Sequence, residues 1–205
     1  MSTWRRPTYF NPDASAAAAS VADQADLVGQ FHKQLPGYKP TSLVKLDDVA
    51  RELGVGSVYL KDETSRFGLP SFKILGASWG SFRALAQRLN IPLDADFETM
   101  KKAAAAEPGS LTLYATTDGN HGRAVARMGA SFNISSQIHV PSTMNQETIE
   151  LVRLEGATVV ISTGSYDKAV LEAQKASEHT NGILIQDFAF GDYDLIPQAS
   201  LCNVA

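Results

Sequence analysis

Two short motifs contain the side chains best suited to chemistry. Lys73 stands in Ser71-Phe72-Lys73-Ile74-Leu75-Gly76, and Asp118-Gly119-Asn120-His121-Gly122 begins 45 positions later (118 minus 73). Lys73 falls at the start of a predicted helix, where exposed N–H groups carry about half a positive charge and disfavour the ammonium by roughly 0.3–1 kcal/mol. A neutral amine attacks carbonyls, so the position suits a lysine that bonds covalently to an aldehyde.

Each motif also has a purely structural explanation, which the residues alone leave open. Lys73 could be a solvated helix lysine, Asp118 a helix cap, and Gly119–Gly122 a tight turn from a strand into a helix. Asp187 could be a turn residue at a strand end. His121 is interpreted as a packing residue or one that supports a ligand-binding residue, because a lone histidine without a partner is weak support for catalysis.

The elements that must position these residues follow from the hydrophobic pattern. Apolar residues at 72, 75, 79, 82, 86 and 89 trace one face of a helix, with Ser71 as its expected N-cap. Before it, we expect a helix at Val21–Gln34, a strand at Thr41–Leu46, a helix at Asp47–Leu53 and a buried strand at Ser57–Asp62. The segment after Pro92 has the composition of a helix as far as Glu107.

From Leu111 onward the chain alternates between the two periods, which predicts a parallel sheet. Strands are expected at Leu111–Thr116, Gln137–Val140, Thr158–Ser162 and Gly182–Gln186, and helices at Arg123–Gly129, Asn145–Leu154 and Tyr166–His179. This order predicts an α/β fold, a three-layer αβα sandwich with a mostly parallel sheet. Ligands of such sheets bind beyond the carboxyl ends of the strands, and both Asp118 and Asp187 come just past a strand.

Composition narrows the class of protein. The 205 residues are 44% hydrophobic with a net charge of −4, and basic residues form no patch larger than a pair, which argues against nucleic-acid binding. No apolar stretch is long enough to span a membrane, and no targeting peptide is expected. The single Cys202 and four unpaired histidines predict neither a disulfide nor a metal site. We therefore expect a soluble cytoplasmic protein with a small-molecule partner.

Together, SFKILGA and TTDGNHG resemble the motifs of the pyridoxal-phosphate enzymes of the tryptophan synthase β-like fold. The resemblance implies that the cofactor is pyridoxal 5′-phosphate and that Lys73 carries it as a Schiff base. It further implies that Asn120 donates a hydrogen bond to the cofactor's 3′ oxygen, with Gly119 and His121 in the same cofactor-binding turn.

A closer similarity is to the diaminopropionate ammonia-lyases, through PGYKPTSLVKLDDVARELGVGSVYLKDETSRFGL and the later QDF. It implies elimination of ammonia from 2,3-diaminopropionate to give pyruvate, with Asp118 and Asp187 as bases for α-protons of opposite stereochemistry. Most of the wider family has serine at the Asp118 position, which disfavours the alternative of a serine or threonine dehydratase.

The similarity covers about the amino-terminal half of such an enzyme, from about Phe31 to Pro197. The family's phosphate-binding glycine run lies downstream of it, and no two of the 15 glycines here are adjacent. We expect residues 1–70 to form an arm and the first elements of an incomplete large domain, 71–190 a small cofactor-covering domain, and 191–205 an irregular tail. A truncated fold would leave apolar surface exposed, so an inactive remnant or interaction module is an alternative, and the homodimer common in the family is an open expectation.

Overall fold

The structure is a computed structural model that describes residues 26–107, 111–194 and 196–197. It begins with a helix over residues 26–34, so the predicted start of this helix at Val21 lies outside the described residues. Cys202 and most of the predicted tail also lie outside them.

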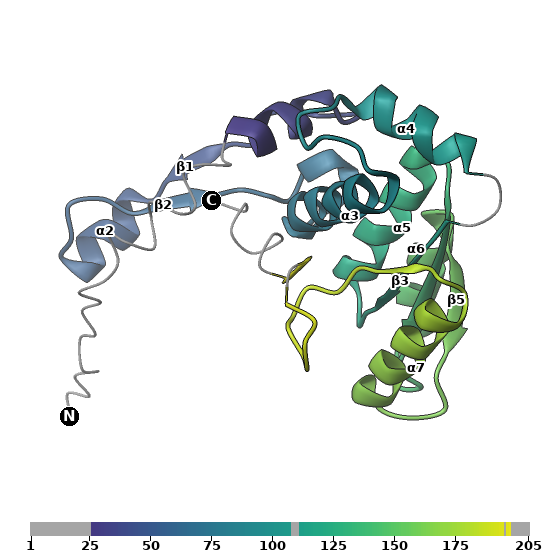
Figure 1. Ribbon diagram of the computed structural model, residues 1–205. Helices are drawn as coiled ribbons and strands as arrows, with labels where there is room; N and C mark the ends of the chain where they lie inside the picture. The colour runs from purple at the N-terminus through teal and green to yellow at the C-terminus, as the bar shows by residue number, and fades with distance from the viewer. Residues whose placement is uncertain (1–25, 108–110, 195, 198–205) are drawn as a thin grey trace.

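A four-stranded parallel sheet forms the centre of the α/β body (Figure 1). Its strands lie in the order β5-β4-β3-β6, so β6, the last of these four strands in the sequence, pairs with β3, the first of them. Tyr114 lies opposite Gln137 on one side and opposite Leu184 on the other. The strand bounds are β3 Thr112–Thr116, β4 Ser135–Val140, β5 Thr158–Ile161 and β6 Ile183–Leu184.

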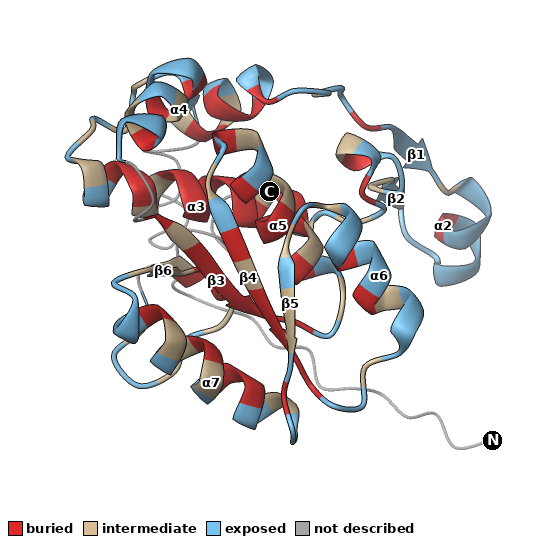
Figure 2. Cartoon of the chain, turned by 90° about the vertical axis from the view of Figure 1, so that its right-hand side faces the viewer, coloured by how far each residue is buried: buried red, intermediate tan, exposed pale blue. Residues whose placement is uncertain are grey.

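Helices cover both faces of this sheet, which confirms the predicted three-layer α/β architecture. From β3 to β5 the chain moves across the sheet in one direction through α5 (Asn120–Phe132) and α6 (Gln146–Leu154), and then returns to β6 through α7 (Tyr166–His179). Right-handed crossovers place helices on opposite faces when the direction reverses. Accordingly α7 lies on the face opposite α5 and α6 (Figure 2). Helices α3 (Lys73–Leu89) and α4 (Phe97–Ala106) pack on the outside of α5.

The core lies mainly between α3, α5 and the sheet. Trp79, Phe82 and Leu85 of α3 are completely buried. The helix over residues 26–34 joins this core through Phe31, whose ring centroid is 4.6 Å from that of Phe82 and 5.5 Å from that of Trp79. These contacts fix the helix whose first residue is Lys73. Within the described residues, no helix has both the length and the apolarity to cross a bilayer.

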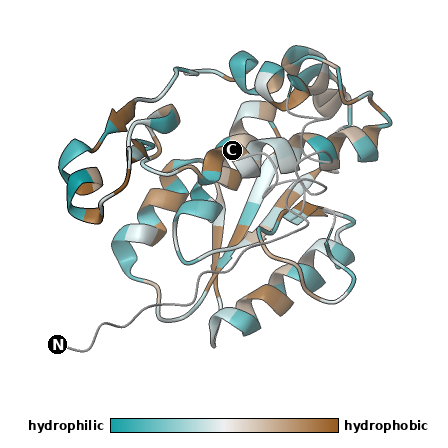
Figure 3. Ribbon diagram, turned by 90° about the vertical axis from the view of Figure 1, so that its left-hand side faces the viewer, coloured by the Kyte–Doolittle hydropathy of each residue, from teal (hydrophilic) through white to brown (hydrophobic). Residues whose placement is uncertain are grey.

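An arm made of β1, α2 and β2 projects away from the α/β body (Figure 1). It comprises β1 (Leu43–Lys45), α2 (Asp47–Leu53) and β2 (Tyr59–Lys61), with the two strands paired antiparallel. The prediction of a buried strand here is wrong: every residue of β2 is exposed, because among the described residues the strand pairs only with β1 and no helix covers either of its faces. The exposed large apolar side chains of the arm include Leu43, Leu53 and Leu60. Brown, hydrophobic segments are visible along the arm in Figure 3.

Candidate active site

The carboxyl edge of the parallel sheet brings together groups from distant parts of the sequence. Strands β3 and β6 are neighbours and run parallel, so the loops that follow them leave from the same edge. Asp118 follows β3 and Asp187 follows β6. Lys73 is the first residue of α3, and its side chain reaches the same edge, where it contacts Asp187.

A single carboxylate oxygen joins the amine to the glycine-flanked turn. Lys73 Nζ donates to Asp187 Oδ2 over 2.5 Å, and His121 Nδ1 lies 3.8 Å from the same oxygen. His121 Nε2 lies 2.9 Å from the carbonyl oxygen of Ile185 and, as its only available role, donates to it. The sequence-predicted residues Lys73, His121 and Asp187 therefore form one contact group.

Burial and charge set the protonation of this group. Burial lowers the pKa of His121, whose Nε2–H donates to the carbonyl oxygen of Ile185 while Nδ1 faces Asp187. For Asp187, burial alone would raise the pKa, but the nearby His121 ring and the hydrogen bond and charge of Lys73 together bring it below its ordinary value.

The turn before α5 is built around Thr117, a residue that the sequence analysis did not single out. Its buried Oγ1 accepts hydrogen bonds from Gly119 N and Gly122 N, both over 2.9 Å. A Cβ on Gly122 would collide with Thr117 Cγ2 and would come within 2.8 Å of Ile138 Cγ2, so this glycine allows the close approach of helix and strand. Only its position in a TTDG run could have indicated the capping role of Thr117.

Tyr166, the first residue of α7, is a second residue that sequence reasoning missed. Burial raises the pKa of Tyr166 to about 12, with further contributions from the charges of Asp187 and Asp118. The Tyr166 hydroxyl accepts from Gln186 Nε2 over 3.2 Å, and Gln186 Oε1 accepts from Thr116 N over 3.0 Å. The phenol is thus tied to β3 through a buried glutamine.

The loop that leads into Lys73 is held on both sides. Arg66 pairs with Glu63 over 2.6 Å, and its Nη2 donates to Thr41 Oγ1 over 2.7 Å. Arg127 Nη1 donates to the carbonyl oxygen of Phe67 over 2.6 Å while its Nε pairs with Glu155 over 2.6 Å.

At the start of α3, the expected N-cap is wrong by one residue, because Phe72 occupies that position without a side-chain hydrogen bond. Ser71 still contributes, since its Oγ accepts from Lys73 N.

These residues fit the aldehyde end of a pyridoxal cofactor. Lys73 supplies an accessible amine, with 39% of its side chain exposed. Asn120 is exposed at the first turn of α5, and no described residue hydrogen bonds its side-chain amide, which leaves it available to a ring oxygen. Gly119 offers no free N–H there, because Thr117 already binds it. No group of three or more His, Cys, Asp or Glu among the described residues is arranged to hold a metal ion.

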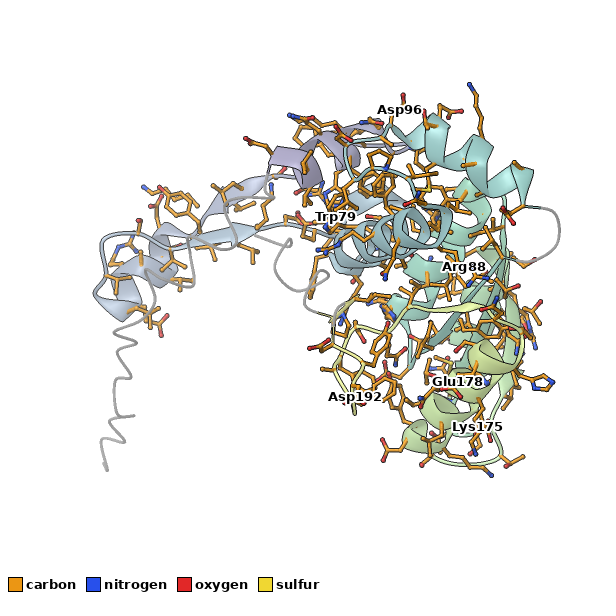
Figure 4. All side chains as sticks on the ribbon, in the orientation of Figure 1. Trp79, Arg88, Asp96, Lys175, Glu178 and Asp192 are labelled. Atoms are coloured by element: carbon orange, nitrogen blue, oxygen red, sulfur yellow. The ribbon has the colours of Figure 1, made fainter. Side chains whose placement is uncertain are left out.

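A groove of about 610 Å³ lies elsewhere, between the ends of α3 and α7 and the segment after β6. Arg88 and Glu178 flank it from the two helices (Figure 4). Its lining includes none of Lys73, Asp118 or Asp187, so the groove is separate from the site at the sheet edge.

Comparison with known proteins relates these features to one family. The family model described as "Pyridoxal-phosphate dependent enzyme" matches residues 34–198. The diaminopropionate ammonia-lyase of Escherichia coli K12 is 35% identical over 191 residues, which are 92% of this chain and 46% of that protein. The chain therefore spans about half the length of the curated relatives it matches.

Solved structures agree with the sequence comparison. The holo diaminopropionate ammonia lyase of Escherichia coli superposes with a TM-score of 0.80 at 32% identity, covering 88% of this chain and 45% of that one. Threonine deaminase isoform 2 from Solanum lycopersicum has a TM-score of 0.59 at 23% identity, covering 88% and 42%, and shares the fold.

Proposed function

The chain belongs to the pyridoxal-phosphate dependent enzyme family, and from this we propose that it contributes to a lyase that eliminates ammonia from 2,3-diaminopropionate to give pyruvate. The observation that carries the proposal is the contact of Lys73 with Asp187, beside the turn that contains Asn120. It supports a site in which one amine, one amide and two carboxylates face a single ligand.

In this proposal Lys73 binds the cofactor aldehyde and Asn120 donates to the cofactor's 3′ oxygen. Gly119 and His121 shape the turn around them. When bound, the cofactor supplies a ring that stabilises negative charge at the substrate α-carbon. The same amine, when free, can accept and return protons at that carbon.

The two carboxylates are assigned to the α-protons of the two substrate isomers. Asp118 lies past β3 and Asp187 past β6, so the two carboxylates reach the ligand from neighbouring loops of one sheet edge. A carboxylate that is held ionised near neutral pH, as Asp187 is by the nearby His121 and Lys73, is in the form needed to accept a proton. Loss of the substrate's β-amino group follows removal of the α-proton.

A second candidate function is an interaction module without catalysis. The exposed apolar residues of the arm, with Leu43 at 64% and Leu53 at 65% exposed, favour it because such side chains are normally covered by protein. Under this alternative the chain would keep the α/β body but would not retain cofactor. A serine or threonine dehydratase is the third reading, and Asp118 argues against it.

The proposal also covers the domain boundaries, the oligomeric state and the cellular compartment. We assign residues 71–190 to the small cofactor-covering domain, 1–70 to an arm with the first elements of a large domain, and 191–205 to a tail. We further propose a homodimer in a reducing cytoplasm. Sedimentation equilibrium of the purified chain tests the dimer, and a single monomeric species would rule it out.

A labelling experiment tests the main proposal. The purified chain is incubated with pyridoxal phosphate and borohydride, and peptide mapping should place the pyridoxyl group on Lys73. Lys45→Ala is the matched control, because Lys45 is also an exposed lysine paired with an aspartate, at 2.7 Å. Labelling that persists unchanged in Lys73→Ala would defeat the cofactor assignment. Pyruvate release is then compared between diaminopropionate and serine, and equal rates would favour the dehydratase.

A further inference from the structure

The strand that leads to Asp187 lies at the edge of the sheet. In the order β5-β4-β3-β6, β3 has a strand on each side, whereas β6 pairs only with β3 among the described residues. Ile185 N donates to the carbonyl oxygen of Tyr114 over 2.7 Å, so the backbone groups of its two neighbours, Leu184 and Gln186, are directed away from β3. Without a partner on that side, the strand end before Asp187 would be held by one strand only.

The hydroxyl of Tyr193 occupies this open edge. It donates to the carbonyl oxygen of Leu184 and accepts from Gln186 N, both over 2.9 Å. In a parallel pair of strands, one residue binds these same two groups, the C=O of residue i and the N–H of residue i+2, with its own N–H and C=O. The phenol, which has one donor and an acceptor oxygen, therefore takes the place of one residue of a neighbouring strand. Burial raises the pKa of Tyr193, so the hydroxyl keeps the proton that it donates.

The segment after Asp187 turns back and brings Tyr193 to the edge. Phe190 N donates to the carbonyl oxygen of Tyr193 over 3.2 Å and Tyr193 N to that of Phe190 over 2.9 Å, with Gly191 at a φ of 53° in the turn between them. The rings of Phe190 and Tyr193 stack with their centroids 5.2 Å apart. The hydrogen bond from Gln186 N to the Tyr193 hydroxyl thus closes a short loop, residues 186–193, that contains Asp187.

Other contacts hold only the chain before Asp187. His121 Nε2 donates to the carbonyl oxygen of Ile185 over 2.9 Å, and Gln186 Oε1 accepts from Thr116 N over 3.0 Å. Tyr193 differs from them because it ties the chain after Asp187 back to the chain before it. An aspartate between two fixed points has little freedom to leave Lys73, whose Nζ lies 2.5 Å from its Oδ2.

We propose that Tyr193 is a positioning residue for Asp187: its hydroxyl closes the free edge of β6 and so holds the carboxylate against Lys73. The inference rests on the proposed function for the role of Asp187 as a base, but the contact with Lys73 is independent of it. Tyr193 acts through the backbone and not on a ligand. Without its hydroxyl, the carbonyl oxygen of Leu184 and the N–H of Gln186 lose their partner, and the carboxylate spends less time at Lys73.

A double-mutant cycle without cofactor tests this role. The titration of Asp187 is followed by NMR of ¹³C-labelled aspartate carboxyls, with the signal assigned by its loss in Asp187→Asn. His121 and Lys73 both lower the pKa of Asp187, so a carboxylate that moves away from Lys73 titrates at higher pH. Tyr193→Phe should raise the Asp187 midpoint by about 0.5 pH unit, roughly threefold in proton affinity. In a Lys73→Met background the same substitution should add little, because the contact that it maintains is already gone.

Two results overturn the proposal: an unchanged midpoint in Tyr193→Phe, or the same rise with and without Lys73, which a general loosening of the strand end would give. Tyr114→Phe is the matched control and should leave the midpoint unchanged. It also removes a hydrogen-bonded hydroxyl from this sheet, the one that lies 2.9 Å from Thr180 Oγ1. Thermal unfolding checks the folding of each variant, and Tyr193→Met replaces Tyr193→Phe if the latter does not fold.

Turnover in a preparation that takes up cofactor gives a second readout. Tyr193→Phe should lower kcat about tenfold for the isomer of diaminopropionate whose turnover falls in Asp187→Asn, because the base is less well placed. KM and the rate with the other isomer should stay unchanged, and equal losses with both isomers would overturn the assignment. A chain that takes up no cofactor would contradict the proposed function, while the titration of Asp187 would still decide the role of Tyr193.

Discussion

Lys73 Nζ and Asp187 Oδ2 lie 2.5 Å apart although 114 residues separate them in the sequence. The contact depends on the sheet order, which puts β6 beside β3 and brings the loop after β6 to the helix that begins at Lys73. The amine and the carboxylate, far apart in the sequence, therefore meet only when β6 has paired with β3.

The first prediction concerns the two isomers of diaminopropionate. If Asp118 and Asp187 serve opposite isomers, Asp118→Asn and Asp187→Asn should each lower kcat for one isomer by about 10²–10⁴-fold, the usual contribution of a positioned base. The rate with the other isomer should change little. Pyruvate release from the separate isomers measures this, in a preparation that takes up cofactor. Equal losses with both isomers in either variant would contradict the two-base assignment.

A second prediction concerns the cap at Thr117. Thr117→Val keeps the shape of the side chain but removes the acceptor of two N–H groups, at Gly119 and Gly122. We expect a loss of about 1–3 kcal/mol in the free energy of unfolding, because buried donors are left unpaired. Thr117→Ser keeps the hydroxyl and should lose much less. Urea denaturation of the two variants decides, and equal losses would show that packing of the methyl group matters more than the cap.

The third prediction uses two helical glycines. Gly122→Ala should destabilise the protein by about 1–3 kcal/mol, since the new methyl group meets Thr117 and Ile138. Gly29→Ala is the control, because nothing lies within 4 Å of a Cβ there, and better helix propensity should leave it equal or up to about 1 kcal/mol more stable. Thermal or urea unfolding compares them. Similar values for the two variants would rule out the proposed close packing at Gly122.

The fourth prediction concerns pH. Burial lowers the pKa of His32 from 6.5 to about 4, so the unfolded chain binds more protons than the folded one between these values. Stability should therefore be complete above about pH 6.5 and fall as the pH drops toward 4, by about 3 kcal/mol from this group. Urea unfolding from pH 7 to pH 4 measures the fall. His32→Asn should show a shallower pH dependence, and an unchanged slope would assign the effect to other groups.

The sequence predicted the architecture well and the site only in part. Alternation of strands and helices from Leu111 onward was enough for the parallel sheet, because burial on both faces imposes a clear pattern. That Asp118 and Asp187 come after strands was also visible. That they follow neighbouring strands was not visible, because the pairing of β6 with β3 depends on the direction in which the chain crosses the sheet.

The residues that sequence reasoning missed act through contacts and not through motifs. Thr117 and Tyr166 are ordinary residues at the beginning of helices, and their roles appear only once Gly122 and Gln186 lie next to them. The prediction for the arm was wrong because it relied on the pattern alone. The apolar residues of Ser57–Asp62 suggested a buried strand, but nothing in the described part of the chain covers them.

The two hydrogen-bonded ends of Arg127 have a mechanical consequence. One end holds the carbonyl oxygen of Phe67 in the loop before Lys73, and the rest of the side chain belongs to α5, which begins at Asn120. This hydrogen bond links α5 to the segment that leads into the lysine. We therefore expect the amine of Lys73 and the amide of Asn120 to move together, so that thermal motion changes the distance between them little.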